Sequence, residues 1–161
     1  MWVEAWLKDR RQRVCLNGVR SDWRSVFSGV PQGSVLGPEL FLIFINDLEF
    51  GILSSVFKFA DDTKVLGRIV GEEDCLRLQN DIDALCNWSD KWLMKFNVAK
   101  CKVMHHGNGN SGHKYSMNGY CLDELKSEKD LGVIISHDLK VFEQCQHAYS
   151  KANSMLGLLK R

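Results

Sequence analysis

The 161-residue sequence has little proline, little net charge and no long hydrophobic run. It contains two prolines, its formal net charge is +1, and its longest uninterrupted apolar run covers the six residues from Leu40 to Ile45. A membrane-spanning helix needs about 20 apolar residues, so the sequence predicts no transmembrane segment. With 45% hydrophobic and 25% charged residues, the composition argues against a disordered or collagen-like chain and predicts one globular domain over residues 1–161.

The N-terminal sequence MWVEAWLKDRR does not have the basic stretch followed by an apolar stretch that is typical of a signal peptide. We therefore expect an intracellular protein, in the cytoplasm or the nucleus. The six cysteines are scattered and include no C-x-x-C pair, and Cys101, His105 and His106 do not have zinc-finger spacing. This pattern favours free, mostly buried thiols over a disulfide framework or a zinc site.

Charge is balanced overall but segregated along the chain. Residues 8–24 hold six basic side chains against two acidic ones, and residues 91–114 hold five lysines and no acid. Residues 72–90 hold six acids against one arginine. Basic segments of this kind can bind nucleic acid. On charge alone, however, ordinary solvated faces are the simpler interpretation. Trp23 lies in the first basic segment and could stack on a base, although burial of its ring is the favoured interpretation.

Hydrophobic periodicity and turn signals predict an α+β fold, in which helices pack on one face of an antiparallel sheet. Asn17-Gly18 is a strong hairpin signal, and the glycine- and proline-rich stretch at 29–38 must be a loop. No internal repeat, linker or domain boundary is visible. We expect helices over 1–8, 38–47, 72–96 and 139–160, and strands near 12–16, 23–27, 54–70, 101–106, 120–122 and 131–136.

Asp61 and Asp62 are the first candidate for chemistry. These adjacent carboxylates lie between two apolar strand segments, at the expected tip of a hairpin. A polar turn is the simplest explanation, because aspartate is common in tight turns. Carboxylates held by two strands are also good ligands for hard divalent cations, and a pair of Mg²⁺ ions can catalyse phosphoryl transfer. From these two residues alone, both interpretations stay open.

The loop at 29–38 is the second candidate. Its glycines permit close approach of a ligand, and backbone amides near a helix N-terminus favour phosphate. The loop is not a P-loop, because the Lys-Ser/Thr pair of that motif is missing. By itself the loop is a weak signal.

Three motifs, taken together and in order, are far more specific. GVPQGSVLGP, LFLIFINDL and FKFADDTKV, followed by NWSDKWLMKFNVAKCKVM and EKDLGVIIS, resemble the reverse transcriptase domain of non-LTR (LINE-type) retrotransposons. The resemblance extends over essentially the whole chain. It implies an RNA-directed DNA polymerase that takes an RNA template, a DNA primer and deoxynucleotides. The implied fold is the palm of the right-hand polymerase fold and the start of the thumb, with the fingers missing.

The resemblance also implies roles for individual residues. Asp61 and Asp62 match the aspartates of the family's [FY]xDD hairpin, and both would be catalytic ligands of Mg²⁺. Gln32 and Gly33 match the motif that lies against the template and the incoming nucleotide. Lys100 matches the palm lysine proposed to neutralise or protonate the departing pyrophosphate.

One departure from the family pattern concerns the metal site. The family uses a further metal-binding aspartate from an earlier palm strand, before the segment that resembles WLKDRRQRVCLNG. Neither Asp9, Asp22 nor Asp47 is a convincing substitute. We therefore expect weak Mg²⁺ binding and no polymerase activity by this chain alone. The alternatives are a non-catalytic nucleic-acid-binding remnant, or an unstable fragment translated from an element. The apolar stripe of the last helix suggests contact with the rest of a polymerase domain, or self-association.

Overall fold

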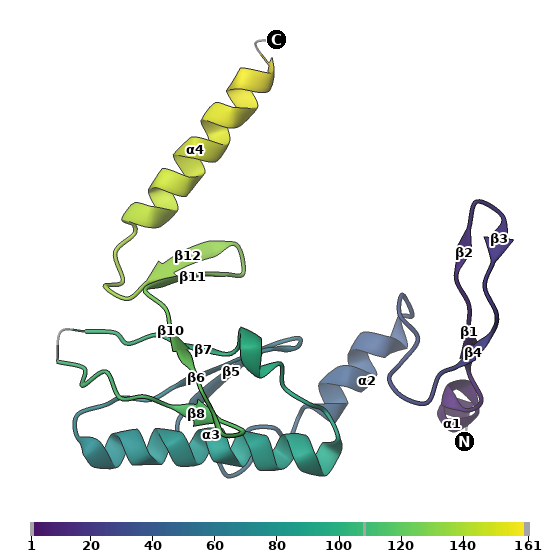
Figure 1. Ribbon diagram of the computed structural model, residues 1–161, viewed down its shortest axis with the longest axis horizontal. Coiled ribbons are helices and arrows are strands. Elements are labelled where there is room, and N and C mark those ends of the chain that lie inside the picture. Colours follow the sequence, from purple (N-terminus) through teal and green to yellow (C-terminus); the bar gives the residue numbers. More distant parts are fainter. Residues whose placement is uncertain (1, 108, 160–161) are drawn as a thin grey trace. The chain divides into compact units, whose positions relative to one another are not determined.

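The computed structural model describes residues 2–107 and 109–159 (Figure 1). The chain divides into two compact units, although the sequence shows no boundary. The first comprises Met1–Leu48 with Lys58–Thr63, and the second comprises Glu49–Phe57 with Lys64–Arg161. Helices and short strands occur in both, so the structure is α+β, as the sequence predicts.

The first unit contains two helices and two short antiparallel ladders. Strands β1 and β4 pair with each other, and β2 pairs with β3 beyond them. Asn17 and Gly18 connect β2 to β3 with φ angles of +49° and +81°. Positive φ at both turn residues is what a two-residue hairpin needs, which confirms the predicted turn. The elements are α1 (Trp2–Leu7), β1 (Arg11–Gln12), β2 (Cys15–Leu16), β3 (Val19–Arg20), β4 (Arg24–Ser25) and α2 (Leu36–Phe44).

Helix α2 begins two residues earlier than the sequence predicts. Ser34 explains this start, because its hydroxyl donates to the Pro31 carbonyl (2.7 Å) and accepts from the Gly37 amide (3.0 Å). A serine that accepts from an amide of the first turn stabilises a helix N-terminus. Gly37 is buried, and a Cβ at this position would lie 2.8 Å from the Ser34 hydroxyl. The glycine therefore lets the loop close against the helix.

The second unit contains the long helix α3 and the remaining strands. Strands β5 and β6 form a hairpin whose tip belongs to the first unit. The elements are β5 (Ser55–Phe59), β6 (Asp62–Leu66), α3 (Glu72–Trp92), the 3₁₀ turn η1 (Val98–Lys100), β7 (Lys102–Val103), β8 (Ser116–Met117), β9 (Tyr120–Cys121), β10 (Asp123–Glu124), β11 (Ser127–Asp130), β12 (Val133–Ser136) and α4 (Phe142–Leu159).

Helix α3 carries most of the core of the second unit. Its apolar positions recur with helical spacing, and it packs alongside β8 (Figure 1). At its start, the Asp74 carboxylate accepts from the amides of Val70 (2.8 Å) and Gly71 (3.2 Å), and these bonds lower the pKa of Asp74. The buried hydrophobic residues of this unit are Cys75, Ile82, Leu85, Cys86, Trp88, Tyr115 and Met117.

The structure ends α3 at Trp92, four residues before the predicted end. Leu93 adopts the left-handed conformation, with φ of +57°, and the amides of Leu93 and Met94 donate to the Ser89 carbonyl. This geometry terminates a helix. Glycine and asparagine are the usual residues in this helix-ending conformation, so a leucine does not indicate from the sequence that the helix ends here.

Asp81 is a buried charge with a structural role. Its side chain is on α3 and only 3% exposed, and its two carboxylate oxygens accept from the amides of Leu53 and Ser54, both at 2.9 Å. A buried carboxylate is tolerated when charge-assisted hydrogen bonds of this kind satisfy it. Asp81 therefore fastens the segment just before β5 to the long helix.

The sheet differs from the single antiparallel sheet that the sequence predicts. In the described part of the chain, the strands form six two-stranded ladders, and one of them, β7 with β10, is parallel. Most strands are two residues long, and tight turns with positive φ, such as Asn17-Gly18 and Asn118-Gly119, connect several of the paired strands. Apolar alternation predicts a strand, but it does not specify which strand lies next to it.

No residue of α4 is buried, so the predicted association through its apolar stripe stays a prediction. The six cysteines are free thiols, and only Cys75 and Cys86 are buried. The expectation of mostly buried thiols is therefore wrong, because Cys15, Cys121 and Cys145 lie on exposed elements. No helix among the described residues is long and apolar enough to cross a membrane.

Candidate functional site

The two adjacent aspartates lie at the tip of the β5–β6 hairpin. The connection is the two-residue turn Ala60-Asp61, and Asp62 is the first residue of β6. The turn is therefore centred one residue earlier than the sequence predicts. Ala60 has φ of +53°, a conformation that costs a residue with a Cβ roughly 1–2 kcal/mol. Two strands with alternating burial hold this strained turn in place.

Both aspartates are exposed, and both carboxylates are available to a ligand. Within the described residues, neither of the two carboxylate groups makes a hydrogen bond or an ion pair. The two neighbouring lysines have partners elsewhere: Lys64 pairs with Asp130 on β11, and Lys58 donates to backbone carbonyls. Free carboxylate oxygens are the donors that a hard divalent cation takes. The residues present therefore fit part of a magnesium site.

Lys58 connects the hairpin to the end of helix α2. Its ammonium group donates to the carbonyls of Asn46 (3.2 Å) and Ile45 (3.5 Å), directly after the helix. A cation at the C-terminal end of a helix is favourable, because the last carbonyls carry partial negative charge. Ile45 and Leu48 are buried beside this contact, at 3% and 2% exposure. The hairpin tip and the helix that follows the glycine-rich loop thus belong to one packed unit.

The glycine-rich loop presents Gln32 and Gly33 to solvent. Both residues are exposed, and Gly33 has φ of +81° with open space where a Cβ would point. The Arg10 guanidinium holds the start of the loop by donating to the carbonyls of Ser28 (3.1 Å) and Gly29 (2.5 Å). No hydrogen bond joins Gln32 to either aspartate in the described part of the unit. The glycine-rich loop and the two aspartates thus belong to the same unit, without a direct hydrogen bond from Gln32 among the described residues.

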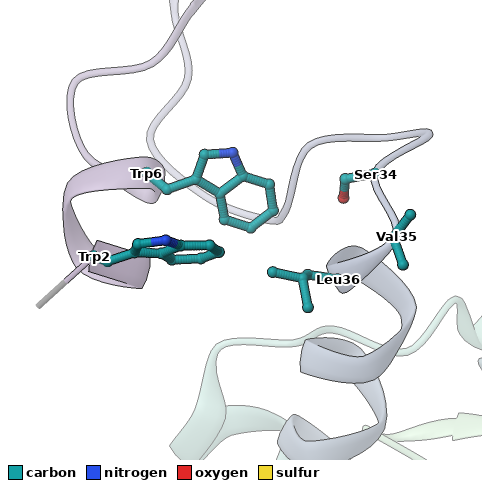
Figure 2. A pocket seen from close by; sticks show the side chains of 5 residues that line it. All are labelled: Trp2, Trp6, Ser34, Val35 and Leu36. Carbon is teal, nitrogen blue, oxygen red and sulfur yellow. The ribbon is translucent and has the colours of Figure 1, made fainter.

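An apolar pocket lies next to this loop, and sequence reasoning did not anticipate it. The pocket has a volume of about 400 Å³ and lies between α1 and the start of α2. Figure 2 shows the indoles of Trp2 and Trp6 on one side and Leu36 on the other. The spacing of four between the tryptophans was the available signal, because it places them on one face of a helix. The lining is Trp2, Trp6, Ser34, Val35 and Leu36.

Lys100 lies in a different part of the molecule. It ends the 3₁₀ turn η1, its side chain is exposed, and it belongs to the second unit, whereas Asp61 and Asp62 belong to the first. Its relation to the carboxylates stays a prediction. Among the described residues, no group of three or more histidine, cysteine or acidic side chains could hold a metal ion. The hairpin thus presents two carboxylates, and within the described ranges no third histidine, cysteine or acidic residue completes a metal cluster with them.

Comparison with known sequences assigns the chain to a family. Residues 1–152 match the family model of the reverse transcriptase (RNA-dependent DNA polymerase), so the chain belongs to this family. Its curated relatives are polymerases of mobile elements. It is 30% identical to the RNA-directed DNA polymerase from mobile element jockey of Drosophila melanogaster, over 149 residues and 85% of this chain. The resemblance to non-LTR retrotransposon enzymes is thereby confirmed.

Two further relatives match with the same coverage. The jockey polymerase of Drosophila funebris is 32% identical over 149 residues, and the probable RNA-directed DNA polymerase from transposon BS of Drosophila melanogaster is 31% identical over 153 residues. In each case the match covers 85% of this chain and 16% of the relative. The chain therefore spans about one sixth of the length of these relatives. No solved structure matches it.

Proposed function

We propose that this chain is the palm segment, with the start of the thumb, of an RNA-directed DNA polymerase, and that Asp61 and Asp62 hold its catalytic Mg²⁺. The observation that supports this most strongly is the β5–β6 hairpin. Two carboxylates stand on a strained turn between paired strands, and the neighbouring lysines are bound to other groups. Their oxygens are therefore neither neutralised nor hydrogen-bonded before a cation arrives.

The proposed roles follow the family pattern. Asp61 would bind both metal ions and Asp62 would be a second, less direct ligand. Mg²⁺ supplies charge stabilisation to the attacking and leaving oxygens of nucleotidyl transfer. Gln32 and Gly33, exposed in their loop, would lie against the template and the incoming deoxynucleotide. Lys100 would compensate the charge of the departing pyrophosphate. The template would be RNA and the primer DNA.

We also propose that the 161-residue chain does not polymerise DNA unaided. Two carboxylates from a single hairpin leave most coordination positions of two metal ions to water, and Mg²⁺ demands near-ideal octahedral geometry. A third carboxylate from another segment would have to complete the site. Metal binding by the chain alone should then be weak but dependent on the hairpin.

A metal-binding experiment tests the role of the hairpin. Mn²⁺, a paramagnetic substitute for Mg²⁺, is titrated into the full chain and free Mn²⁺ is followed by electron paramagnetic resonance. Asp61→Asn is expected to weaken binding about tenfold or more, because it removes one charged ligand. The matched control is Asp22→Asn, an exposed aspartate elsewhere in the first unit. Equal affinities of the wild-type chain and Asp61→Asn would refute the proposed metal role.

Primer extension on an RNA template tests catalysis. We expect no Mg²⁺-dependent incorporation by the folded chain alone. Incorporation that disappears in Asp61→Asn would confirm the hairpin as the catalytic centre but contradict the proposed inactivity, and it would require a third carboxylate within this chain. Incorporation that persists in Asp61→Asn would contradict the assignment of the hairpin.

A non-catalytic role in binding nucleic acid is the second candidate function. The observation that favours it is the basic segment at 8–24, whose residues Arg11 to Arg24 are all exposed. Binding of this kind would weaken steeply with salt, because phosphate contacts release counterions. An affinity that does not change between low and moderate salt would count against it.

A further inference from the structure

One exposed hairpin of the first unit is not part of the proposed catalytic site. Residues 10–26 form what we call the basic hairpin, made of β1 to β4, and every residue from Arg11 to Ser25 is exposed. Trp23 is 53% exposed. The interpretation that Trp23 is buried is therefore wrong, because the hairpin places the ring at the surface and not in a core.

Strand register brings Trp23 onto one face of the hairpin together with two arginines. Arg11 pairs with Ser25, and Gln12 pairs with Arg24. Extending this register by one residue places Arg13 across from Trp23, and Arg11 and Arg13, two residues apart in a strand, share a face. The side chains agree with this placement. The guanidinium carbon of Arg13 lies 4.4 Å from the centroid of the Trp23 ring, and that of Arg11 lies 5.7 Å away.

A bulge separates this patch from the tip of the hairpin. Beyond Trp23 the register shifts by one, because Cys15 pairs with Arg20. The additional residue is Asp22, and Ser21 closes the irregular stretch through two bonds with the Val14 backbone, both 3.0 Å long. A bulge increases local twist and re-aims side chains. The Arg11–Arg13–Trp23 face is therefore a defined surface, distinct from the tip.

The arginines of this hairpin fall into two groups. Arg10 is used internally, since its guanidinium donates to the carbonyls of Leu7 (2.9 Å) and Ser28 (3.1 Å) and fastens the base of the hairpin. Among the residues the structure describes, the others form no ion pair with a carboxylate. They are Arg11, Arg13, Arg20 and Arg24.

We propose that the basic hairpin binds single-stranded nucleic acid, with a base stacked on Trp23 and phosphates held by Arg11 and Arg13. The ligand class rests on the proposed function, but the surface is separate from the metal site. Guanidinium groups that no carboxylate neutralises and an exposed aromatic ring beside them are the two parts of a single-strand platform, because the first bind phosphate and the second stacks on any base. An acidic protein surface would pair with the arginines but would leave the indole without a planar partner.

Fluorescence anisotropy tests the proposal with the full chain and labelled 12-nucleotide strands. The strands are oligoadenylate as RNA, oligoadenylate as DNA, an abasic strand with the same number of phosphates, and an RNA duplex. Trp23→Ala is expected to weaken binding of both oligoadenylates about tenfold, in line with the loss of one base stack. The abasic strand and the duplex should bind more weakly and should not respond to the substitution, because neither presents a free base face.

Four variants separate stacking from charge and from folding. Trp23→Phe keeps an aromatic face and should retain most of the affinity. Arg13→Gln should reduce the slope of log affinity against log salt by about one, as expected for one lost phosphate contact. Two matched controls should bind like the wild-type chain: Trp2→Ala removes an exposed tryptophan of α1, and Arg68→Gln removes an exposed arginine of the second unit.

The outcomes are distinct. The proposal is overturned if Trp23→Ala binds oligoadenylate as tightly as the wild-type chain, or if the duplex binds as tightly as the single strand. RNA bound more tightly than DNA would support the proposal with RNA as its ligand, and equal affinity would support it for either sugar. Failure of the metal site is measured separately, because the Mn²⁺ titration contains no nucleic acid and the anisotropy measurement contains no divalent cation.

Discussion

The buried face of α3 and the basic hairpin both carry tryptophan and cysteine, but α3 buries these side chains and the hairpin exposes them. Trp88 on α3 is 9% exposed and Trp23 in the hairpin is 53% exposed. Cys75 is buried on α3, whereas Cys15 is exposed on β2. The difference arises because α3 packs its apolar stripe against β8, while in the described part of the chain the ladders of the basic hairpin, β1 with β4 and β2 with β3, pair with no other strand.

This contrast separates stability from binding. The free energy of folding comes mainly from buried apolar area, which α3 supplies and the hairpin does not. The hairpin instead presents arginines and an indole that make no contribution to a core. Two expected differences follow. Substitutions on α3 should reduce stability with little direct effect on binding, and substitutions on the hairpin should do the reverse.

The largest expected effect compares the two tryptophans. Trp88→Ala should lower the free energy of unfolding by about 4 kcal/mol, because it leaves a large cavity in the core. Trp23→Ala should lower it by less than about 1 kcal/mol, the scale of an exposed cation–π contact. Urea unfolding followed by circular dichroism measures both. Equal losses for the two variants would remove the distinction between core and surface tryptophan.

A pH effect of intermediate size should arise on the α3 side alone. Burial of Tyr115, 2% exposed, raises its pKa from 10.0 to about 12, and its hydrogen bond to Cys75 adds to the shift. Because the folded-state pKa is above the unfolded value, this stabilisation is complete below pH 10 and disappears as the pH rises through 12. The stability lost over this window should be about 2–3 kcal/mol.

Tyr115→Phe is the matched variant for this prediction. It keeps the ring but removes the titrating hydroxyl, so the alkaline loss of stability relative to the wild-type chain should be absent. Tyrosinate absorbance gives an independent measurement, because Tyr115→Phe should remove a component that ionises near pH 12. Loss of this component near pH 10 instead would contradict the prediction.

The smallest expected effect is a gain in stability at the end of α3. Leu93→Gly should raise the free energy of unfolding by about 0.5–1 kcal/mol, because glycine adopts φ of +57° without a Cβ penalty and the leucine side chain is 87% exposed. Leu76→Gly is the control, since Leu76 is exposed within α3 and glycine should destabilise it there. A loss of stability for both variants would show that Leu93 contributes packing.

Much of the local structure could be predicted from the sequence. Asn17-Gly18 is a hairpin turn, the apolar spacing of α3 marks its buried face, and Asp61 and Asp62 lie together at the end of a strand pair. These features depend on residues close in sequence. The early end of α3 at Leu93 could not be predicted, because a leucine in the left-handed conformation is imposed by its surroundings and not by its own preference.

For the candidate site, too, some features could be predicted from the sequence and others could not. The resemblance to the family predicts site roles for Asp61, Asp62, Gln32, Gly33 and Lys100 from the order of the motifs. The sequence could not show that Lys58 and Lys64 bind other groups and leave the aspartates unpaired, because the partners of the two lysines are 12 and 66 residues away. The apolar pocket of Trp2, Trp6 and Leu36 likewise depends on α1 meeting the start of α2.

Motif order, local periodicity and turn chemistry were sufficient to predict the family, the adjacent carboxylates and the type of most elements. They could not predict which strands pair, which tryptophan is buried or which charges are already neutralised, and the folded chain shows these. Burial and pairing are properties of two surfaces in contact. A segment carries one of those surfaces, and the rest of the fold supplies the other or leaves it exposed.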